Sequence, residues 1–413
     1  MRIFHFMNIP LNIEHLIGDS NSITTAGGWL AVLLHHLHQE TDFQFACAAF
    51  GAVGETQHFY NDRIDCFVIP RKHGPLSGSV DHSLKSCQLL VEQWKPNLIH
   101  IHGTEQVYGL LSARRMIKLP TVISLQGLLG PYSEWYNYFG NASLIDILHM
   151  HRWLEIPAGR GQLIGFLKFK KQAVRELEII KGNKFFMGRT EWDKAYIRAI
   201  NPSAGYYHCG ELLRSAFTQK RWELSRSHRH RIIFTNAGHP RKGTETLLNA
   251  VKILQPHFPD IQVCIAGGIS SRSGYGKYIR HKITCLGNAG IELGQLNADQ
   301  MAEELIKSHV FVSPSFIDNS PNAVCEAHMV GIPVISTYTG GVPSLIDDGL
   351  TGLFFPCGDA PMLAERIRQI FENDDLAIQL GARAHKVAIK RHHSEQVISE
   401  IVAAYEDVIR NSQ

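Results

Sequence analysis

Two carboxylates, Asp318 and Glu326, stand eight positions apart on either side of a proline. Ionised carboxylates accept hydrogen bonds, so this pair can recognise hydroxyl groups. Asp318 could meet the hydroxyls of a sugar, and Glu326 could take a vicinal diol such as a ribose. The plainer alternative is that Asp318 only caps a helix and that Glu326 is a solvated helix residue. The β-rich segment and the Gly340-Gly341 turn that follow favour a sugar-nucleotide pocket over that alternative.

The residues around the two carboxylates predict the elements that hold them. An apolar strand ends near Ser313, and Pro321 lies where the first turn of a helix tolerates a residue without an N–H group. We therefore expect a helix over residues 322 to 330, with one of three preceding side chains as its cap: Asp318, Asn319 or Ser320. The free N–H groups of the first turn, at Asn322 and Ala323, carry partial positive charge and suit a diphosphate.

Residues 312 to 341 resemble the Glu-x7-Glu signature of retaining glycosyltransferase family four, with Asp318 in the place of the first glutamate. Residues 340 to 356 are similar to the segment that follows in this family, and the likeness is strongest over residues 231 to 356. The resemblance implies the GT-B fold, an α/β architecture in which two doubly wound, Rossmann-like domains face each other across a cleft. It also implies a nucleoside-diphosphate sugar donor, here expected to be UDP-linked, with retention of anomeric configuration and no metal. Because aspartate is one methylene shorter than glutamate, the donor sugar could sit differently.

A basic loop at residues 236 to 243 resembles the loop with which the family neutralises the donor diphosphate. Lys242-Gly243 matches the family's Lys-Gly pair. Ala237 stands where an arginine is usual, which makes Arg241 a candidate substitute. A cation here stabilises the negative charge that grows on the leaving diphosphate as the glycosidic bond breaks. A solvated surface loop is the alternative.

The first half of the chain offers further candidates at the ends of its strands. His102 ends a strand at the edge where ligands bind in open α/β sheets. Gln126 ends the next strand, where many relatives carry a histidine that contacts the donor. An amide can donate a hydrogen bond but cannot titrate. Arg189 could meet the diphosphate or the acceptor, or it could be a surface residue at the start of a helix.

Three small or apolar residues complete the expected site. Gly27 and Gly28 precede a helix, where the backbone could approach a phosphate or an acceptor, although an ordinary glycine-rich loop is the alternative. Leu296, in Gly-Gln-Leu, resembles the family's turn that packs against the nucleobase.

Composition argues against several classes of protein. The chain has 413 residues, 44% hydrophobic and 19% charged, which is typical of a globular protein large enough for two cores. A net charge of +3 argues against a nucleic acid partner. The eight cysteines form no C-x-x-C pair and no short metal-ligand spacing, so we expect free thiols in a reducing cytoplasm and no bound metal. No run of about 18 apolar residues could span a membrane, and the N-terminal residues fit a first strand better than a signal sequence.

One region is basic enough to suggest a membrane surface. Residues 151 to 200 hold eleven Lys and Arg against five acidic residues. Within this region, residues 160 to 182 could lie on an anionic membrane that carries a lipid-linked acceptor, which would make the protein peripheral at the inner face of the membrane. A solvated helix is the alternative.

Strands and helices are expected to alternate in both halves of the chain. In the first half, strands are expected at 3–7, 43–50, 66–69, 98–102, 121–125 and 184–187, with helices at 28–39, 79–94, 106–117 and 191–200. In the second half, strands are expected at 231–235, 262–266, 310–312 and 333–336, with helices at 244–254, 298–307 and 322–330. We expect an N-terminal, acceptor-side domain over residues 1–217, joined by a return helix at about 394–413. The donor-nucleotide domain is expected over residues 218–393.

These features predict a retaining glycosyltransferase that moves a sugar from a nucleoside-diphosphate sugar to a glycan or a lipid-linked glycan. The alternative is a catalytically weak sugar-nucleotide-binding or partner protein of the same fold, because Asp318, Ala237 and Gln126 all depart from the usual pattern. A GT-B epimerase or phosphorylase is a third interpretation.

Overall fold

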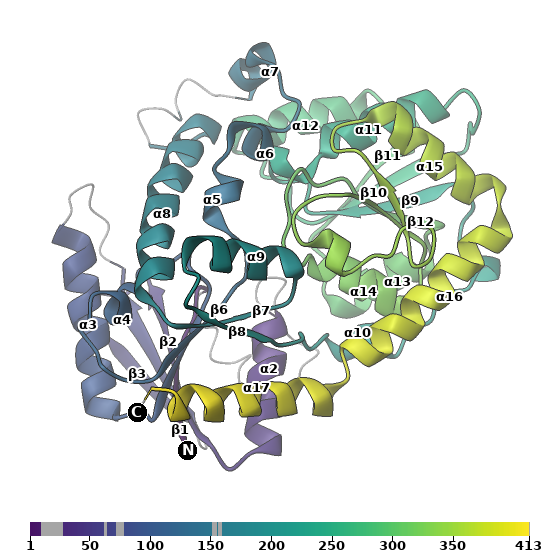
Figure 1. The fold of residues 1–413 in the computed structure, drawn as a ribbon. Helices are drawn as coiled ribbons and strands as arrows, with labels where there is room; N and C mark the ends of the chain where they lie inside the picture. The colour runs from purple at the N-terminus through teal and green to yellow at the C-terminus, as the bar shows by residue number, and fades with distance from the viewer. Residues whose placement is uncertain (10–27, 62–63, 72–77, 151–154, 156–158, 413) are drawn as a thin grey trace. The chain divides into compact units, whose positions relative to one another are not determined.

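A computed structural model describes residues 1–9, 28–61, 64–71, 78–150, 155 and 159–412. The chain forms two compact units (Figure 1). Unit 1 comprises residues 1–130, 171–212 and 392–413, and unit 2 comprises residues 131–170 and 213–391. The chain therefore enters unit 1 three times. This division counts residues 131–170 with unit 2, whereas the expected boundaries counted them with the N-terminal domain.

Unit 1 is built on an eight-stranded sheet with the order β3-β4-β2-β1-β5-β6-β7-β8. All neighbours in it are parallel except β3 and β4. Its strands are β1 (Arg2–Phe6), β2 (Gln44–Gly51), β3 (Gln57–Asn61), β4 (Ile64–Pro70), β5 (Leu98–His102), β6 (Thr121–Ser124), β7 (Phe185–Gly188) and β8 (Gly205–His208). Its helices include α2 (Gly28–Glu40), α3 (Gly78–Trp94), α4 (Leu110–Ala113), α9 (Glu191–Ile200) and α17 (Ser394–Arg410).

Alternate side chains of β1 bury two separate cores, one on each face of this sheet. Ile3 packs with the apolar side chains of α2 and α17. Phe4 and Phe6 pack with α3, α4 and α9 on the other face. Figure 1 shows α2 in purple beside α17 in yellow, although these helices lie at opposite ends of the chain. The strands are nearly continuous apolar runs because both faces are covered.

Unit 2 is built on a six-stranded parallel sheet with the order β11-β10-β9-β12-β13-β14. Its strands are β9 (Arg231–Thr235), β10 (Gln262–Ala266), β11 (Gly290–Gly294), β12 (Val310–Ser313), β13 (Val334–Thr337) and β14 (Leu353–Phe355). Its helices include α10 (Ser215–Thr218), α11 (Thr244–Leu254), α12 (Gly274–Thr284), α13 (Ala298–Ile306), α14 (Asn322–Val330), α15 (Ala360–Glu372) and α16 (Asp374–Arg391). A large apolar cluster packs around this sheet.

A short helical segment of unit 2 comes from the first half of the chain. It begins at the end of α5 (Leu129–Tyr132), contains α6 (Trp135–Phe139) and α7 (Leu144–His149), and runs into the start of α8 (Gln162–Gly182). Four buried side chains tie these helices together in a small core of their own: Tyr138, Phe139, Ile147 and Phe166.

Most expected elements have the predicted position, and one is wrong in extent. The strands at 98–102, 231–235 and 262–266 and the helices at 191–200, 244–254 and 322–330 have the predicted bounds. The helix expected over 106–117 is reduced to α4. Arg115, two residues beyond its last residue, has a φ of 57° in the left-handed region and prevents continuation.

No helix among the described residues is both long and apolar enough to cross a membrane.

Candidate donor and acceptor sites

Two predicted site residues of unit 2, Lys242 and Asp318, contact each other. The Lys242 Nζ atom lies 2.6 Å from Asp318 Oδ2, and both side chains are largely buried. Lys242 follows β9 and Asp318 follows β12, and these strands are parallel neighbours. The two residues therefore meet at the carboxyl edge of the sheet, where ligands bind in open α/β folds.

Close backbone packing fixes the Lys242 loop against the Asp318 loop. Gly243 has a φ of 70°, and a Cβ atom there would lie 1.9 Å from the Pro314 carbonyl oxygen. Only glycine fits this position without displacing the backbone. The N–H of Phe316 also donates to the Arg241 carbonyl oxygen at 2.7 Å. The Lys-Gly pair thus serves two purposes, because the glycine brings the two loops together and the lysine carries the charge.

The Gly340-Gly341 turn holds the backbone of Asp318. The N–H of Gly341 donates to the Asp318 carbonyl oxygen at 3.0 Å, and a Cβ atom on Gly340 would lie 2.1 Å from that oxygen. Two hydroxyls support the same loop. Thr337 Oγ1 donates to the Ser315 carbonyl oxygen at 2.5 Å, and Thr339 Oγ1 donates to that of Phe316 at 2.8 Å.

The second carboxylate, Glu326, forms a buried ion pair that the sequence did not indicate. Arg214 Nη2 lies 2.6 Å from Glu326 Oε1. Burial raises the pKa of Glu326, and the neighbouring Arg214 guanidinium opposes that shift. Sequence reasoning missed Arg214 because it follows no predicted strand and lies more than a hundred residues from its partner. Asp318 and Glu326 are therefore each bound to a cation of unit 2.

The start of α14 differs from the expectation. Pro321 occupies the N-cap position, where no side-chain cap hydrogen bond forms, so the expected placement of the cap at Asp318, Asn319 or Ser320 is wrong. Asn319 and Ser320 are buried. The first helical residues, Asn322 and Ala323, keep partial exposure, and the Pro321 carbonyl oxygen accepts from the N–H of Val324. This helix start therefore stays partly accessible.

Arg241 and Leu296 lie on loops of the same unit. The Arg241 guanidinium lies 5.6 Å from the ring centre of Tyr132 and 5.8 Å from that of Phe169. It is therefore engaged by aromatic rings of the helical segment. Leu296 is partly buried against the core of unit 2.

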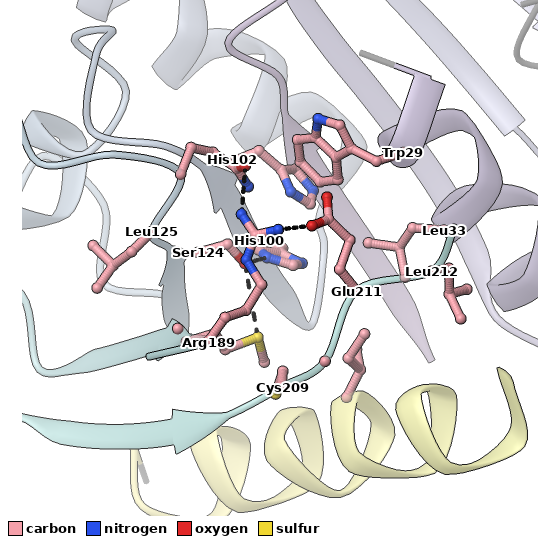
Figure 2. Close-up of a pocket in the computed structure, with 15 residues that line it drawn as sticks. Trp29, Leu33, His100, His102, Ser124, Leu125, Arg189, Cys209, Glu211 and Leu212 are labelled. Atoms are coloured by element: carbon pink, nitrogen blue, oxygen red, sulfur yellow. Dashed lines mark hydrogen bonds and ion pairs between the residues drawn. The ribbon is translucent and has the colours of Figure 1, made fainter. Parts of the chain in front are cut away.

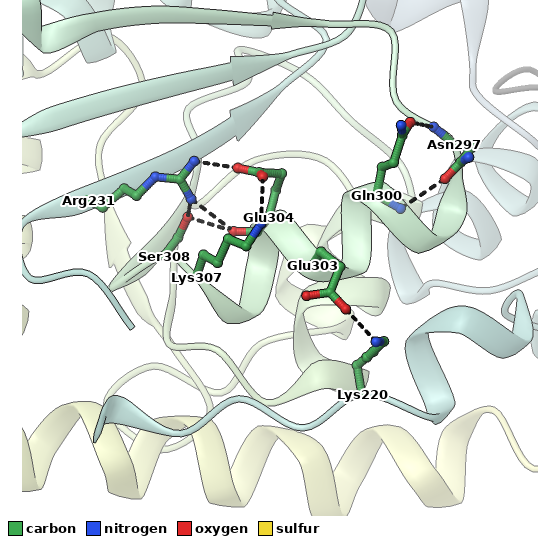
Figure 3. Close-up of polar contacts among 8 residues, drawn as sticks. All are labelled: Lys220, Arg231, Asn297, Gln300, Glu303, Glu304, Lys307 and Ser308. Carbon is green, nitrogen blue, oxygen red and sulfur yellow. Dashed lines mark hydrogen bonds and ion pairs between the residues drawn. The ribbon is translucent and has the colours of Figure 1, made fainter. Parts of the chain in front are cut away.

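The helix that follows Leu296 is fixed at both ends. In Figure 3, Asn297 and Gln300 form a reciprocal capping box at the start of α13. Near its other end, Arg231 binds both Glu304 and Ser308. These contacts fix the turn that presents Leu296.

Unit 1 contains a pocket at the carboxyl ends of β5, β6 and β7. It encloses about 40 Å³ and its lining includes Trp29, His102, Gln126, Arg189 and Glu211. Arg189 forms an ion pair with Glu211, marked by a dashed line in Figure 2, and donates to Gln126 Oε1 at 3.0 Å. The structure thus brings together two predicted residues of the first half, His102 and Gln126, with Arg189. Glu211 was missed because it follows a strand, β8, that the sequence did not predict.

Three buried histidines cluster beside this pocket. β1 and β5 pair with His5 opposite His100, and strand alternation places His102 on the same face. One nitrogen of each lies within 4.8 Å of the others, so the three could hold a metal ion. The expectation of no metal-ligand group came from spacing along the chain and missed this cluster.

The three imidazoles already bond to neighbours. His5 Nδ1 lies 2.9 Å from His102 Nε2, and His100 bonds to the Tyr405 hydroxyl at 2.7 Å and to Ser124. Burial lowers the pKa of His5 to about 3 and holds the pKa values of His100 and His102 well below their usual range. All three are therefore neutral.

The two glycines of the N-terminal loop lie at the limit of the described chain. Gly27 falls outside the described residues, and Gly28 begins α2.

Comparison with known proteins agrees with this fold. Residues 217–387 match the family model described as glycosyl transferases group 1. The sulfoquinovosyl transferase of Arabidopsis thaliana is 22% identical over 72% of this chain and 54% of its own length. The chain spans about half or less of the length of the first curated relatives that it matches.

Two solved structures share the fold over nearly all of the chain. Sucrose-phosphate synthase from Thermosynechococcus elongatus aligns with a TM-score of 0.76 and 16% identity, covering 99% of each chain. Anabaena HepE in complex with UDP and glucose aligns with a TM-score of 0.66 and 14% identity, covering 98% of each chain. The expected GT-B fold is confirmed.

Proposed function

We propose that this protein is a retaining, metal-independent glycosyltransferase that moves a sugar from a UDP-linked donor to a glycan or lipid-linked glycan. The observation that carries the proposal is the pairing of Lys242 with Asp318 at the carboxyl edge of the unit 2 sheet, 2.6 Å apart. A fixed ammonium next to a fixed carboxylate suits a ligand with a diphosphate beside sugar hydroxyls. The match of this unit to glycosyl transferases group 1 supports the same reaction class.

In this proposal the chain's charges act on the leaving group. As the glycosidic bond breaks, negative charge grows on the diphosphate, and the Lys242 ammonium stabilises it. The partly exposed start of α14, at Asn322 and Ala323, adds N–H groups of partial positive charge. Attack by the acceptor comes from the face that the diphosphate leaves, and a phosphate oxygen takes the proton of the acceptor hydroxyl. Retention follows from that geometry without a covalent intermediate.

The nature of the donor is proposed from chemistry and from the relatives. Glu326 accepts from a ribose, with Arg214 holding its carboxylate in place. Leu296 packs against the base. A solved structure of the same fold, HepE, contains UDP and glucose, which favours uracil as that base.

The pocket of unit 1 is our candidate for the acceptor side. Arg189, Glu211 and Gln126 provide donors and acceptors in one small volume beside Trp29. Such a combination of an aromatic ring and paired polar groups suits a sugar hydroxyl. None of the eight cysteines, all of which are described, forms a disulfide, which fits the proposed cytoplasmic location.

Replacement of Lys242 tests the proposed reaction. We expect Lys242→Ala to lower turnover at saturating UDP-sugar by roughly 100-fold or more, since one preorganised charge is lost from the transition state. Lys252→Ala, an exposed lysine on α11, is the matched control. Unchanged turnover in Lys242→Ala would refute the electrostatic role.

The second candidate is a protein that binds sugar nucleotides with little turnover. It is favoured by Ala237, which stands where an arginine is usual in the resembling family and is only 1% exposed in the core of unit 2. A thermal-shift panel of nucleotide sugars followed by a donor-hydrolysis assay separates the two functions. Binding without hydrolysis or transfer across glycan acceptors would favour this second function.

A further inference from the structure

The helical segment at residues 131–170 presents apolar side chains to solvent. On α7, Leu144 is 73% exposed, Ile145 is 66% exposed and Leu148 is 69% exposed. On the first turns of α8, Leu163 and Leu167 are also exposed. Large exposed apolar groups scattered singly are ordinary, but five in so short a stretch of one unit mark an interaction surface.

The exposed side of α7 is held in place by contacts on its other sides. Ile147 packs into the small core with Phe166 of α8. Asp146 accepts from the Tyr278 hydroxyl at 2.7 Å and completes a capping box with Ser143. Folding has therefore fixed the helix while leaving three of its six residues, all large and apolar, outside the core.

The charged side chains on the α8 part of this surface are all positive. Residues 159 to 170 contain Arg160, Lys168 and Lys170 and no acidic residue. All three cations are exposed. Lys170 lies over the Phe166 ring at 5.1 Å, so its stem crosses the apolar face while its ammonium remains in water. Apolar side chains bordered by lysines are typical of helices that lie in the headgroup region of a bilayer.

We propose that these residues form a docking surface for an anionic lipid bilayer, which we call the α7–α8 surface: Leu144, Ile145, Leu148, Leu163, Leu167, Lys168 and Lys170. The leucines and isoleucine enter the headgroup region, and the lysines meet anionic headgroups. The charge pattern selects this occupant, because exposed cations border the apolar groups, and the acid on α7, Asp146, is bonded through both oxygens to Tyr278 and Ser143.

The inner face of the same segment contacts the proposed donor loops. The Tyr138 ring lies 4.6 Å from the His239 ring, and Arg241 lies over Tyr132 and Phe169. Docking would thus place the loop of Lys242 near a membrane, where a lipid-linked acceptor would be found. Membrane binding itself goes beyond the proposed function and does not depend on transfer activity.

Vesicle flotation of the full chain tests the proposal. We expect the protein to float with phosphatidylcholine vesicles that contain phosphatidylglycerol, to float much less with phosphatidylcholine alone, and to be released by high salt. The triple change Leu144→Ser, Ile145→Ser and Leu148→Ser should lower the partition coefficient at least about ten-fold. Lys168→Gln with Lys170→Gln should weaken binding and reduce its salt dependence.

A matched control replaces three exposed isoleucines elsewhere in unit 2, Ile253, Ile378 and Ile389, with serine. This variant should float like the unchanged protein, and both triple variants should keep their melting temperature and UDP affinity. Absence of flotation with anionic vesicles at low salt would overturn the proposal, as would equal loss in the control. A change of oligomeric state in place of vesicle binding would also overturn it and would identify a second copy as the occupant.

Discussion

At the scale of single residues, Asp318 is the side chain on which the proposed donor site depends most. Its carboxylate holds Lys242 at 2.6 Å, and its backbone is held by the Gly340-Gly341 turn. A shorter acid in the place of glutamate therefore still pairs with the lysine, since the loops are packed closely enough for contact. The two carboxylates and the Lys-Gly pair were predictable from residue type and spacing. The partners that hold them, such as Arg214, were not, because they depend on contacts across more than a hundred residues.

Asp318→Asn should separate binding of the nucleotide from binding of the sugar. Removal of a negative charge next to Lys242 frees the ammonium for the diphosphate, so UDP affinity should hold or rise slightly. Turnover of UDP-sugar should fall at least about ten-fold, because the carboxylate's contacts to the sugar are lost. Calorimetric titration with UDP and steady-state kinetics measure the two effects. Asp375→Asn, on the exposed side of α16, is the control, and a large loss of UDP affinity in Asp318→Asn would contradict this assignment.

Glu105 should make stability fall as the pH rises from about 4.5 to about 7. Burial raises the pKa of Glu105 to about 7, and a hydrogen bond from Asn8 opposes this only in part. The folded state then holds a proton that the unfolded state releases above about pH 4.5. This contribution to the free energy of unfolding should therefore be greatest below about pH 4.5, decrease by up to roughly 3 kcal/mol as the pH rises through about 7, and change little above that.

Glu105→Gln should flatten this dependence, whereas Glu55→Gln, at an exposed position, should leave it unchanged. Urea titrations between pH 5 and pH 8 provide the measurement. A parallel decline in Glu105→Gln would assign the pH dependence to another group.

At the scale of elements, a strand or helix could be predicted when its own residues show a clear hydrophobic pattern. Strands such as β9 and β10 are continuous apolar runs between polar residues, so their first and last residues could be predicted from the sequence. β8 was missed because its four residues are partly exposed at the edge of the sheet and lack that pattern. The expected helix over 106–117 had suitable residues, but the left-handed Arg115 ends it early. Tertiary packing decided these cases over local preference.

The pairing of β1 with β5 brings His5 beside His100 and His102, which raises the question of whether the protein needs a metal ion. The histidine cluster could hold an ion, yet His5 and His102 bond to each other and both nitrogens of His100 have partners. An ion would have to break these bonds and would bring charge among buried neutral rings. We therefore expect exhaustive treatment with a chelator to leave both turnover and melting temperature unchanged. Stoichiometric metal in the purified protein, with a lower melting temperature after its removal, would show that the cluster is a metal site.

At the scale of the whole molecule, the chain passes between its two units several times. The sequence alone therefore did not predict which unit each segment belongs to. Residues 131–170 read as part of the first domain because they lie between its strands. Their aromatic residues pack instead on residues of unit 2 that come at least seventy positions later, such as Arg241. The last helix, α17, packs into unit 1 beside α2. The sequence shows two repeating α/β patterns, but it does not show that residues 131–170 belong to unit 2.

The exchange of segments makes the stability of unit 1 depend on the end of the chain, while the proposed donor residues lie wholly in unit 2. Ile398 of α17 is buried in the core that includes Leu30 and Leu34 of α2. Ile398→Ala should therefore lower the free energy of unfolding by about 2–4 kcal/mol. UDP affinity, measured by calorimetry well below the melting temperature, should not change. Ile389→Ala on α16, at an exposed position, should alter neither quantity. A loss of UDP affinity in Ile398→Ala without unfolding would mean that nucleotide binding depends on α17, which contradicts its assignment to unit 2 alone.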